Sequence, residues 1–97
     1  MADALSALAH PIRLKIIFLL LEKEACVCEL AGNLNLPQSL VSQHLAILRG
    51  SGLVKTQRVG NRISYSIADE RLKNLLEISY LIISQRLKEI STLIGGE

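Results

Sequence analysis

The stretch 36-LPQSLVSQHLAILRGSGLVKTQRVGNRISYSI-67 decides the fold of this 97-residue chain. Val41, Leu45 and Leu48 fall at i, i+4 and i+7, the spacing that places apolar side chains on one side of a helix. Gly50 follows shortly afterwards, and glycine is the residue that most readily ends a helix. The first half of the stretch therefore predicts a helix that starts near Pro37 and ends at the glycine.

The second half of the stretch predicts a β-hairpin. Residues 53–59 and 62–67 are strand-like runs, and Gly60-Asn61 between them is a typical two-residue turn. The side chains of a strand alternate between its two faces. This alternation predicts that three apolar residues of the second strand point inward: Ile63, Tyr65 and Ile67.

The helix in the first half has a second, polar side. Ser39, Ser42, Gln43 and Ala46 lie there, whereas a helix that faces only solvent would normally carry Glu and Lys. Base edges in a DNA groove present hydrogen-bond donors and acceptors, which small polar side chains can meet. The composition of this side favours contact with nucleic acid.

The charge pattern supports the same interpretation. No Asp or Glu occurs from residue 30 to residue 68, so this segment carries +4 while the whole chain carries only +2. A basic, acid-free segment around a polar-faced helix is typical of proteins that contact phosphates. Its four basic residues are Arg49, Lys55, Arg58 and Arg62.

Four further helices are predicted, over residues 3–9, 12–24, 26–33 and from 70 to about 94. The helix at 26–33 and the polar-faced helix, joined by a tight turn, form a helix-turn-helix, and the hairpin follows it as a wing. The expected fold is mostly α with a small β-hairpin wing. Its element order is α-α-α-α-β-β-α, in one winged helix-turn-helix domain over residues 1–97.

The apolar content predicts self-association. Apolar residues make up 49% of the chain, which is more than a small monomer readily buries. The last predicted helix has two apolar sides, one for its own core and one for another subunit. We therefore expect a homodimer formed by the first and last helices, with five residues at the interface: Leu5, Leu8, Leu75, Ile78 and Ile82.

Several classes of protein are not supported by the sequence. The longest apolar run, residues 16–21, is too short to cross a bilayer, and no secretory or transit signal precedes it. Two cysteines only two positions apart do not form a disulfide framework, so a cytoplasmic protein is expected. The two histidines are far apart in the sequence, and no acidic cluster or phosphate loop accompanies them, so no enzyme is expected. A protein-interaction module is a distant alternative.

Four segments together resemble the ArsR/SmtB family of winged-helix repressors: LAHPIRLKII, CVCEL, LPQSLVSQHLAILRGSGLV and VGNRISYSI. The resemblance covers nearly the whole chain. It implies a cytosolic homodimer that binds a palindromic operator in double-stranded DNA and leaves it when an inducer binds.

The resemblance also implies a set of DNA contacts. His44 matches a family histidine, although its spacing places it near the apolar stripe and makes a packed role at least as plausible. Arg49 and Lys55 are also predicted to contact DNA, because they are basic residues of the acid-free segment. The other implied contacts are Gln38, Ser39, Ser42, Gln43, Arg58, Asn61 and Arg62.

Cys26 and Cys28 resemble the arsenic- and cadmium-sensing motif of the family. Thiolates are preferred by thiophilic ions, and a helix N-terminus favours the thiolate form. Residues i and i+2 of a helix lie about 200° apart, so both sulfurs cannot easily reach one ion. The sequence therefore predicts that binding of arsenite, or of Cd or Pb, through both thiolates unwinds or bends the first turn of the helix at 26–33.

This sensing site is incomplete in the sequence. Ala31 stands where the arsenic-sensing pattern often has a third cysteine, and the zinc-type site of the last helix is excluded because no histidine follows His44. Glu24, Glu29, a small thiol, water or the partner chain could complete the shell. Two alternatives stay open: a switch through oxidation or persulfidation, and cysteines that act only as small buried hydrophobes. No cofactor is required for either.

Overall fold

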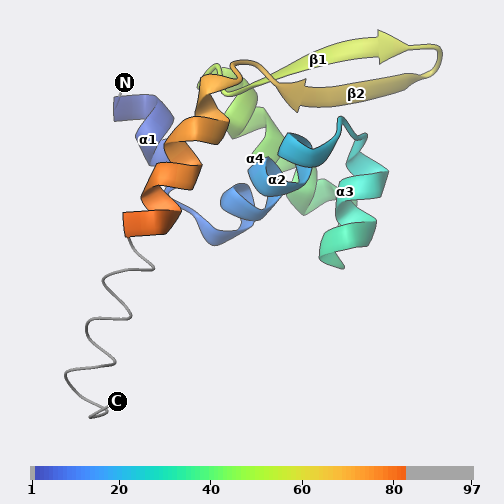
Figure 1. Ribbon diagram of the computed structural model, residues 1–97. Coiled ribbons are helices and arrows are strands. Elements are labelled where there is room, and N and C mark those ends of the chain that lie inside the picture. The colour runs from blue at the N-terminus through green and yellow to red at the C-terminus, as the bar shows by residue number, and fades with distance from the viewer. Residues whose placement is uncertain (1, 83–97) are drawn as a thin grey trace.

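The computed structural model describes residues 2–82 of the chain (Figure 1). Its elements are α1 (Ala2–Leu8), α2 (Pro11–Glu22), α3 (Val27–Leu34), α4 (Gln38–Gly50), β1 (Val54–Val59) and β2 (Arg62–Ile67), followed by a C-terminal helix from residue 71. This order confirms the mostly helical winged helix-turn-helix. The C-terminal helix continues through residue 82, and the predicted extension to about residue 94 lies outside the described residues.

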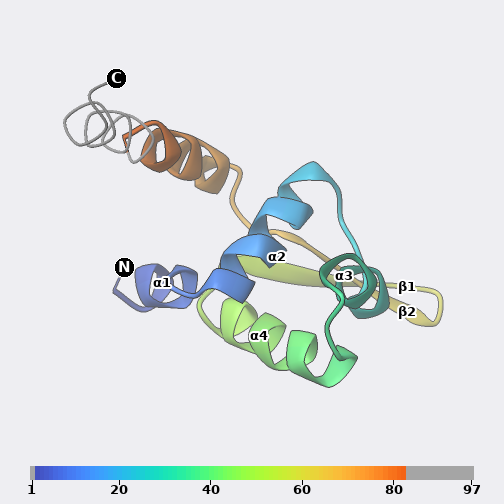
Figure 2. The same cartoon turned by 90° about the horizontal axis from the view of Figure 1, so that it is seen from below.

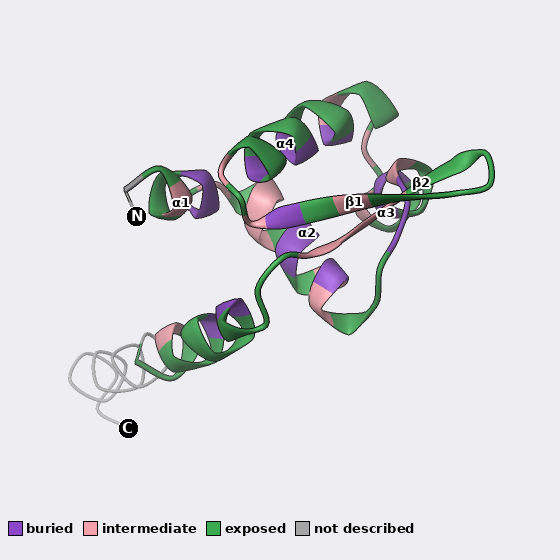
Figure 3. Cartoon of the chain, turned by 90° about the horizontal axis from the view of Figure 1, so that it is seen from above, coloured by how far each residue is buried: buried purple, intermediate pink, exposed green. Residues whose placement is uncertain are grey.

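The core lies between the inward sides of α2, α3 and α4 (Figure 3). The predicted stripe of Val41, Leu45 and Leu48 is completely buried, which confirms the helical periodicity of α4. Leu72 and Leu76 extend the core onto the first turns of the C-terminal helix. Because this stripe faces the core, the opposite, polar side of α4 faces outward.

α2 ends at Glu22, two residues earlier than the sequence predicted, because the chain then extends toward the wing. Ala25 forms an isolated antiparallel bridge with Tyr65 of β2. Two backbone hydrogen bonds close this bridge, with N–O distances of 3.1 and 2.8 Å. The segment that enters α3 is thus attached directly to the wing.

β1 and β2 pair antiparallel with Val54 opposite Ile67 and Val59 opposite Arg62 (Figure 1). Gly60 has a φ of +64° in the turn, a conformation that glycine adopts without strain. The inward prediction for β2 was wrong for Ile63, whose side chain is 49% exposed. Alternation predicts which side a residue faces, but the outer half of the hairpin extends beyond the core, so a residue on the inward side can still be exposed there.

Candidate DNA interface and thiol site

The outward side of α4 is polar and uncovered. Gln38, Ser39, Ser42 and Gln43 are all exposed on it, where the sequence placed them. Figure 2 shows α4 along one face of the molecule, and Figure 3 shows its outward side coloured as exposed. α4 packs on α1, α2, α3 and β1 through its apolar side. A single α-helix fits the major groove of B-DNA, so this side can meet base edges without rearrangement of the core.

The predicted basic residues of the interface are exposed as well. Arg49 lies in the last turn of α4, and Lys55, Arg58 and Asn61 lie on the wing. Within residues 2–82, none of these three cations takes part in a salt bridge. Their charge is therefore available to phosphates.

Arg62 occupies a position that the sequence did not predict. Its Nη2 donates to the Cys26 sulfur at 2.8 Å and to Glu29 Oε1 at 3.2 Å. The Arg62 side chain remains 63% exposed. The structure therefore places Arg62 at the predicted thiol site. No local signal in the sequence indicates this contact, since Arg62 and Cys26 are 36 residues apart.

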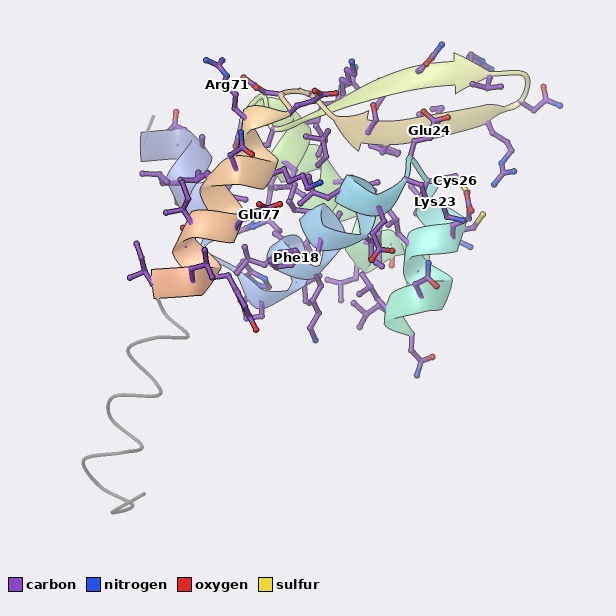
Figure 4. All side chains as sticks on the ribbon, in the orientation of Figure 1. Phe18, Lys23, Glu24, Cys26, Arg71 and Glu77 are labelled. Atoms are coloured by element: carbon purple, nitrogen blue, oxygen red, sulfur yellow. The ribbon has the colours of Figure 1, made fainter. Side chains whose placement is uncertain are left out.

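The two thiols converge at the start of α3, where Figure 4 labels Cys26. Their sulfur atoms are 2.9 Å apart, which contradicts the argument that helical geometry separates them. The reason is that α3 begins at Val27, and Cys26 is its N-cap with an extended backbone (φ −92°, ψ 170°). Both sulfurs can reach one atom, so the predicted unwinding of the first turn is not needed.

The two thiols differ in acidity. The hydrogen bond from Cys28 lowers the pKa of Cys26, and the Arg62 guanidinium lowers it further, while burial opposes both effects. The same hydrogen bond raises the pKa of Cys28. These opposite directions make Cys26 the more acidic of the two thiols, and Cys28 the more exposed one.

Glu29 completes the cluster as a structural partner. Its carboxylate accepts the backbone N–H of Cys26 at 3.2 Å, a capping contact that the Cys-x-x-Glu spacing could have indicated. This hydrogen bond lowers the pKa of Glu29. Glu29 also accepts a hydrogen bond from Arg62. Its carboxylate is therefore already used by the Cys26 backbone and by the Arg62 guanidinium.

The donor set suits some thiophilic species better than others. Among residues 2–82, no group of three His, Cys, Asp or Glu could hold a metal ion. A divalent cation would also meet the positive charge of Arg62 beside Cys26. Arsenous acid is neutral and three-coordinate, so two thiols and one external ligand satisfy it. A hollow of about 180 Å³ at Cys26, between the entry to α3 and β2, leaves room for such a small molecule.

His44 is a correction to the predicted DNA contacts. It is only 9% exposed, and its ring lies 4.6 Å from the ring of His10. Within the described chain, its Nδ1 atom is buried without a hydrogen-bond partner. His44 falls three residues after Val41, on the apolar side of α4, so the packed role is the one that the structure supports.

The buried His44 predicts a loss of stability in mild acid. Burial, followed by the nearby charges of His10 and Arg13, lowers its pKa from the ordinary value of 6.5. The unfolded state then binds more protons, so the free energy of unfolding should fall as the pH decreases below 6.5 and stay unaffected above it. Urea titrations at pH 7.5 and 5.5 should show a smaller pH effect in His44→Gln. An equal pH effect in both proteins would assign the acid sensitivity to another group.

The predicted dimer residues fall into two groups. Leu5, Leu75, Ile78 and Ile82 are 45 to 57% exposed, as an interface requires. Leu8 is buried in the core of its own chain instead, at 8% exposure. Leu75, Ile78 and Ile82 form an exposed apolar surface on the C-terminal helix, and Leu5 is exposed on α1; a second subunit would cover such surfaces.

Comparison with known proteins identifies the family. Residues 10–56 match a model described as bacterial regulatory protein, arsR family. The transcriptional activator HlyU of Vibrio cholerae is 38% identical over 84% of this chain and 75% of its own length. The chain belongs to the ArsR family. The matching model describes regulatory proteins, and HlyU is named a transcriptional activator.

One further relative and one solved structure are similar to this chain. A transcriptional repressor SmtB homolog of Synechocystis is 43% identical over 92% of this chain, which spans 64% of that relative. The homodimeric winged helix-turn-helix DNA-binding domain of Mb0332 from Mycobacterium bovis superposes with a TM-score of 0.84 at 31% identity, covering 91% of this chain and 82% of that one. Within residues 2–82, no helix has the length and apolar character needed to span a membrane.

Proposed function

We propose that this ArsR-family chain is a cytoplasmic homodimeric repressor that releases its operator when a trivalent arsenical binds Cys26 and Cys28. The observation that carries the proposal is the convergence of the two sulfurs to 2.9 Å beside an exposed DNA-facing surface. Homodimerisation through the C-terminal helix would place two α4 helices on one palindrome. Their half-sites should then lie about one helical turn apart, or a multiple of it.

The binding step is a ligand exchange at arsenic. Cys26 and Cys28 each form one S–As bond, and their two protons leave with two hydroxides of arsenous acid as two molecules of water. The third position keeps hydroxide or takes a small external thiol. Two soft sulfur ligands favour this species, whereas Cd²⁺ and Pb²⁺ would lack further ligands and face Arg62.

Oxidation is the second candidate function. The same sulfur separation would allow a peroxide to take two electrons and two protons from the thiols, leaving a disulfide and two molecules of water. Ionisation of Cys26 ahead of Cys28 supplies the attacking thiolate. Reactive sulfur species would act on the same thiolate.

Fluorescence anisotropy with reduced protein and the palindrome nearest its own promoter tests the proposal. Tight, salt-sensitive binding should weaken on addition of arsenite and respond less to cadmium or lead. Release by peroxide alone would support the oxidation candidate. Binding that tightens or stays constant with arsenite would contradict arsenical-driven repression, and an absence of salt-sensitive binding would contradict the DNA interface.

The DNA interface itself predicts two distinct mutant effects. Arg58→Ala removes a wing cation, so it should weaken binding to all sequences and reduce the slope of log affinity against log salt by about one. Gln43→Ala removes a base-edge contact and should cost about 1–3 kcal/mol on the cognate operator only. Salt titrations on cognate and scrambled operators distinguish the two variants. Exchange of the two phenotypes would mean that the wing reads sequence and α4 anchors the backbone.

A further inference from the structure

The outer half of the wing depends on one side chain for its attachment to the helices. Every residue from 58 to 63 is exposed, and neither Val59 nor Ile63 belongs to the buried core cluster. Among residues 2–82, the hydrogen bonds that join it to a helical segment are those from Arg62 to Cys26 and Glu29. The inner half has its own attachment through the bridge between Ala25 and Tyr65.

These two attachments act on the same segment of chain. Ala25 and Cys26 are adjacent, and they bind Tyr65 and Arg62 of one strand. The backbone bridge does not involve either thiol. The Arg62 contact does, because its acceptor is the Cys26 sulfur itself. A chemical change at this sulfur therefore acts on the outer attachment and leaves the inner one intact.

We propose that Arg62 is a positioning residue through which the state of Cys26 controls the outer half of the wing. In the reduced protein, the Cys26 sulfur and Glu29 hold the Arg62 guanidinium and so hold the wing in place for DNA. When the sulfur bonds to arsenic, the new S–As bond uses a lone pair that could accept from Arg62, so the contact weakens and Arg62 detaches. The wing residues Arg58 and Asn61 then lose their fixed position on the operator. This inference rests on the arsenical-responsive repressor proposed above.

The coupling must be reciprocal. If arsenic binding has to break the contact between Arg62 and Cys26, the contact opposes arsenic binding to the same degree. Removal of Arg62 should therefore tighten arsenite binding to the DNA-free protein while it reduces the effect of arsenite on DNA. A residue that served only as a phosphate contact would leave arsenite affinity unchanged.

The test compares Arg62→Gln with Arg58→Gln, a matched loss of one wing cation without a thiol contact. The measured quantity is the ratio of operator Kd with and without arsenite. We expect Arg58→Gln to keep the wild-type ratio, although its DNA binding is weaker. Arg62→Gln should reduce that ratio by about fivefold or more, in the range of common allosteric couplings. Arg62→Lys keeps the charge and should retain part of the wild-type ratio that Arg62→Gln loses.

Hydrogen exchange of the wing amides at positions 58–63 gives a second readout. Arsenite should accelerate this exchange in the wild-type protein, whereas Arg62→Gln should exchange rapidly already and show no further change. A wild-type Kd ratio and wild-type wing exchange in Arg62→Gln would overturn the inference and leave the proposed function intact. Absence of any arsenite effect on DNA binding by the wild-type protein would overturn both.

Discussion

Ile78→Glu is expected to convert the protein to a monomer and to lower its affinity for a palindromic operator by about 100-fold or more. Ile78 is 57% exposed on the C-terminal helix, among the apolar residues that a partner subunit would cover. A carboxylate there would have to be buried without a partner in the dimer, which is strongly unfavourable. A monomer binds one half-site and loses the avidity of two linked sites.

Sedimentation and operator titration of the same samples measure both effects. Lys73→Glu is the control, because it places a carboxylate at an exposed charged position of the same helix, about 140° around the axis from Ile78. It should remain dimeric and bind DNA. A dimeric Ile78→Glu protein would move the interface elsewhere, for example to Phe18 of α2, which is 49% exposed.

Cys26→Ser and Cys28→Ser should each abolish the release of DNA by arsenite. The ratio of operator Kd with and without arsenite should fall from at least about tenfold to near one. Each variant retains a single S–As bond and loses the gain from two linked ligands. The large effect follows from geometry, since sulfurs 2.9 Å apart need little movement to bind the same atom.

Val27→Ser is the control for these cysteine variants. It introduces the same residue between the two thiols and keeps both of them. Its arsenite response should match that of the wild-type protein when each variant is compared with its own arsenite-free affinity. Full release by arsenite in either cysteine variant would show that the inducer binds elsewhere, and the thiols would then be packing residues or an independent redox switch.

The elements of the fold could be predicted because their signals are local. The stripe of α4 repeats at helical spacing, and Gly60-Asn61 joins two strand-like runs, so both elements follow from neighbouring residues. The buried place of His44 follows from the same spacing. The extent to which a side chain is buried cannot be predicted from local spacing. Ile63 alternates with its neighbours as an inward residue should, and it is still exposed.

The thiol site was harder to predict for two physical reasons. A shift of one residue in the start of α3 moves Cys26 from helical to extended backbone, and this reverses the conclusion about whether the sulfurs can meet. Element ends are the least certain part of any sequence interpretation. The Arg62 contact depends on the register of the wing and on the bridge to Ala25, which are properties of the folded chain.

The bridge between Ala25 and Tyr65 also limits how this protein can evolve. Tyr65 pairs with Thr56 on one edge and Ala25 on the other, so its place along the strand cannot shift freely. Arg62 lies three residues away, roughly 10 Å along the strand. One residue inserted between them would turn the guanidinium to the opposite face and away from the sulfur. Insertions should therefore be tolerated at the tip of the hairpin and selected against along this short span.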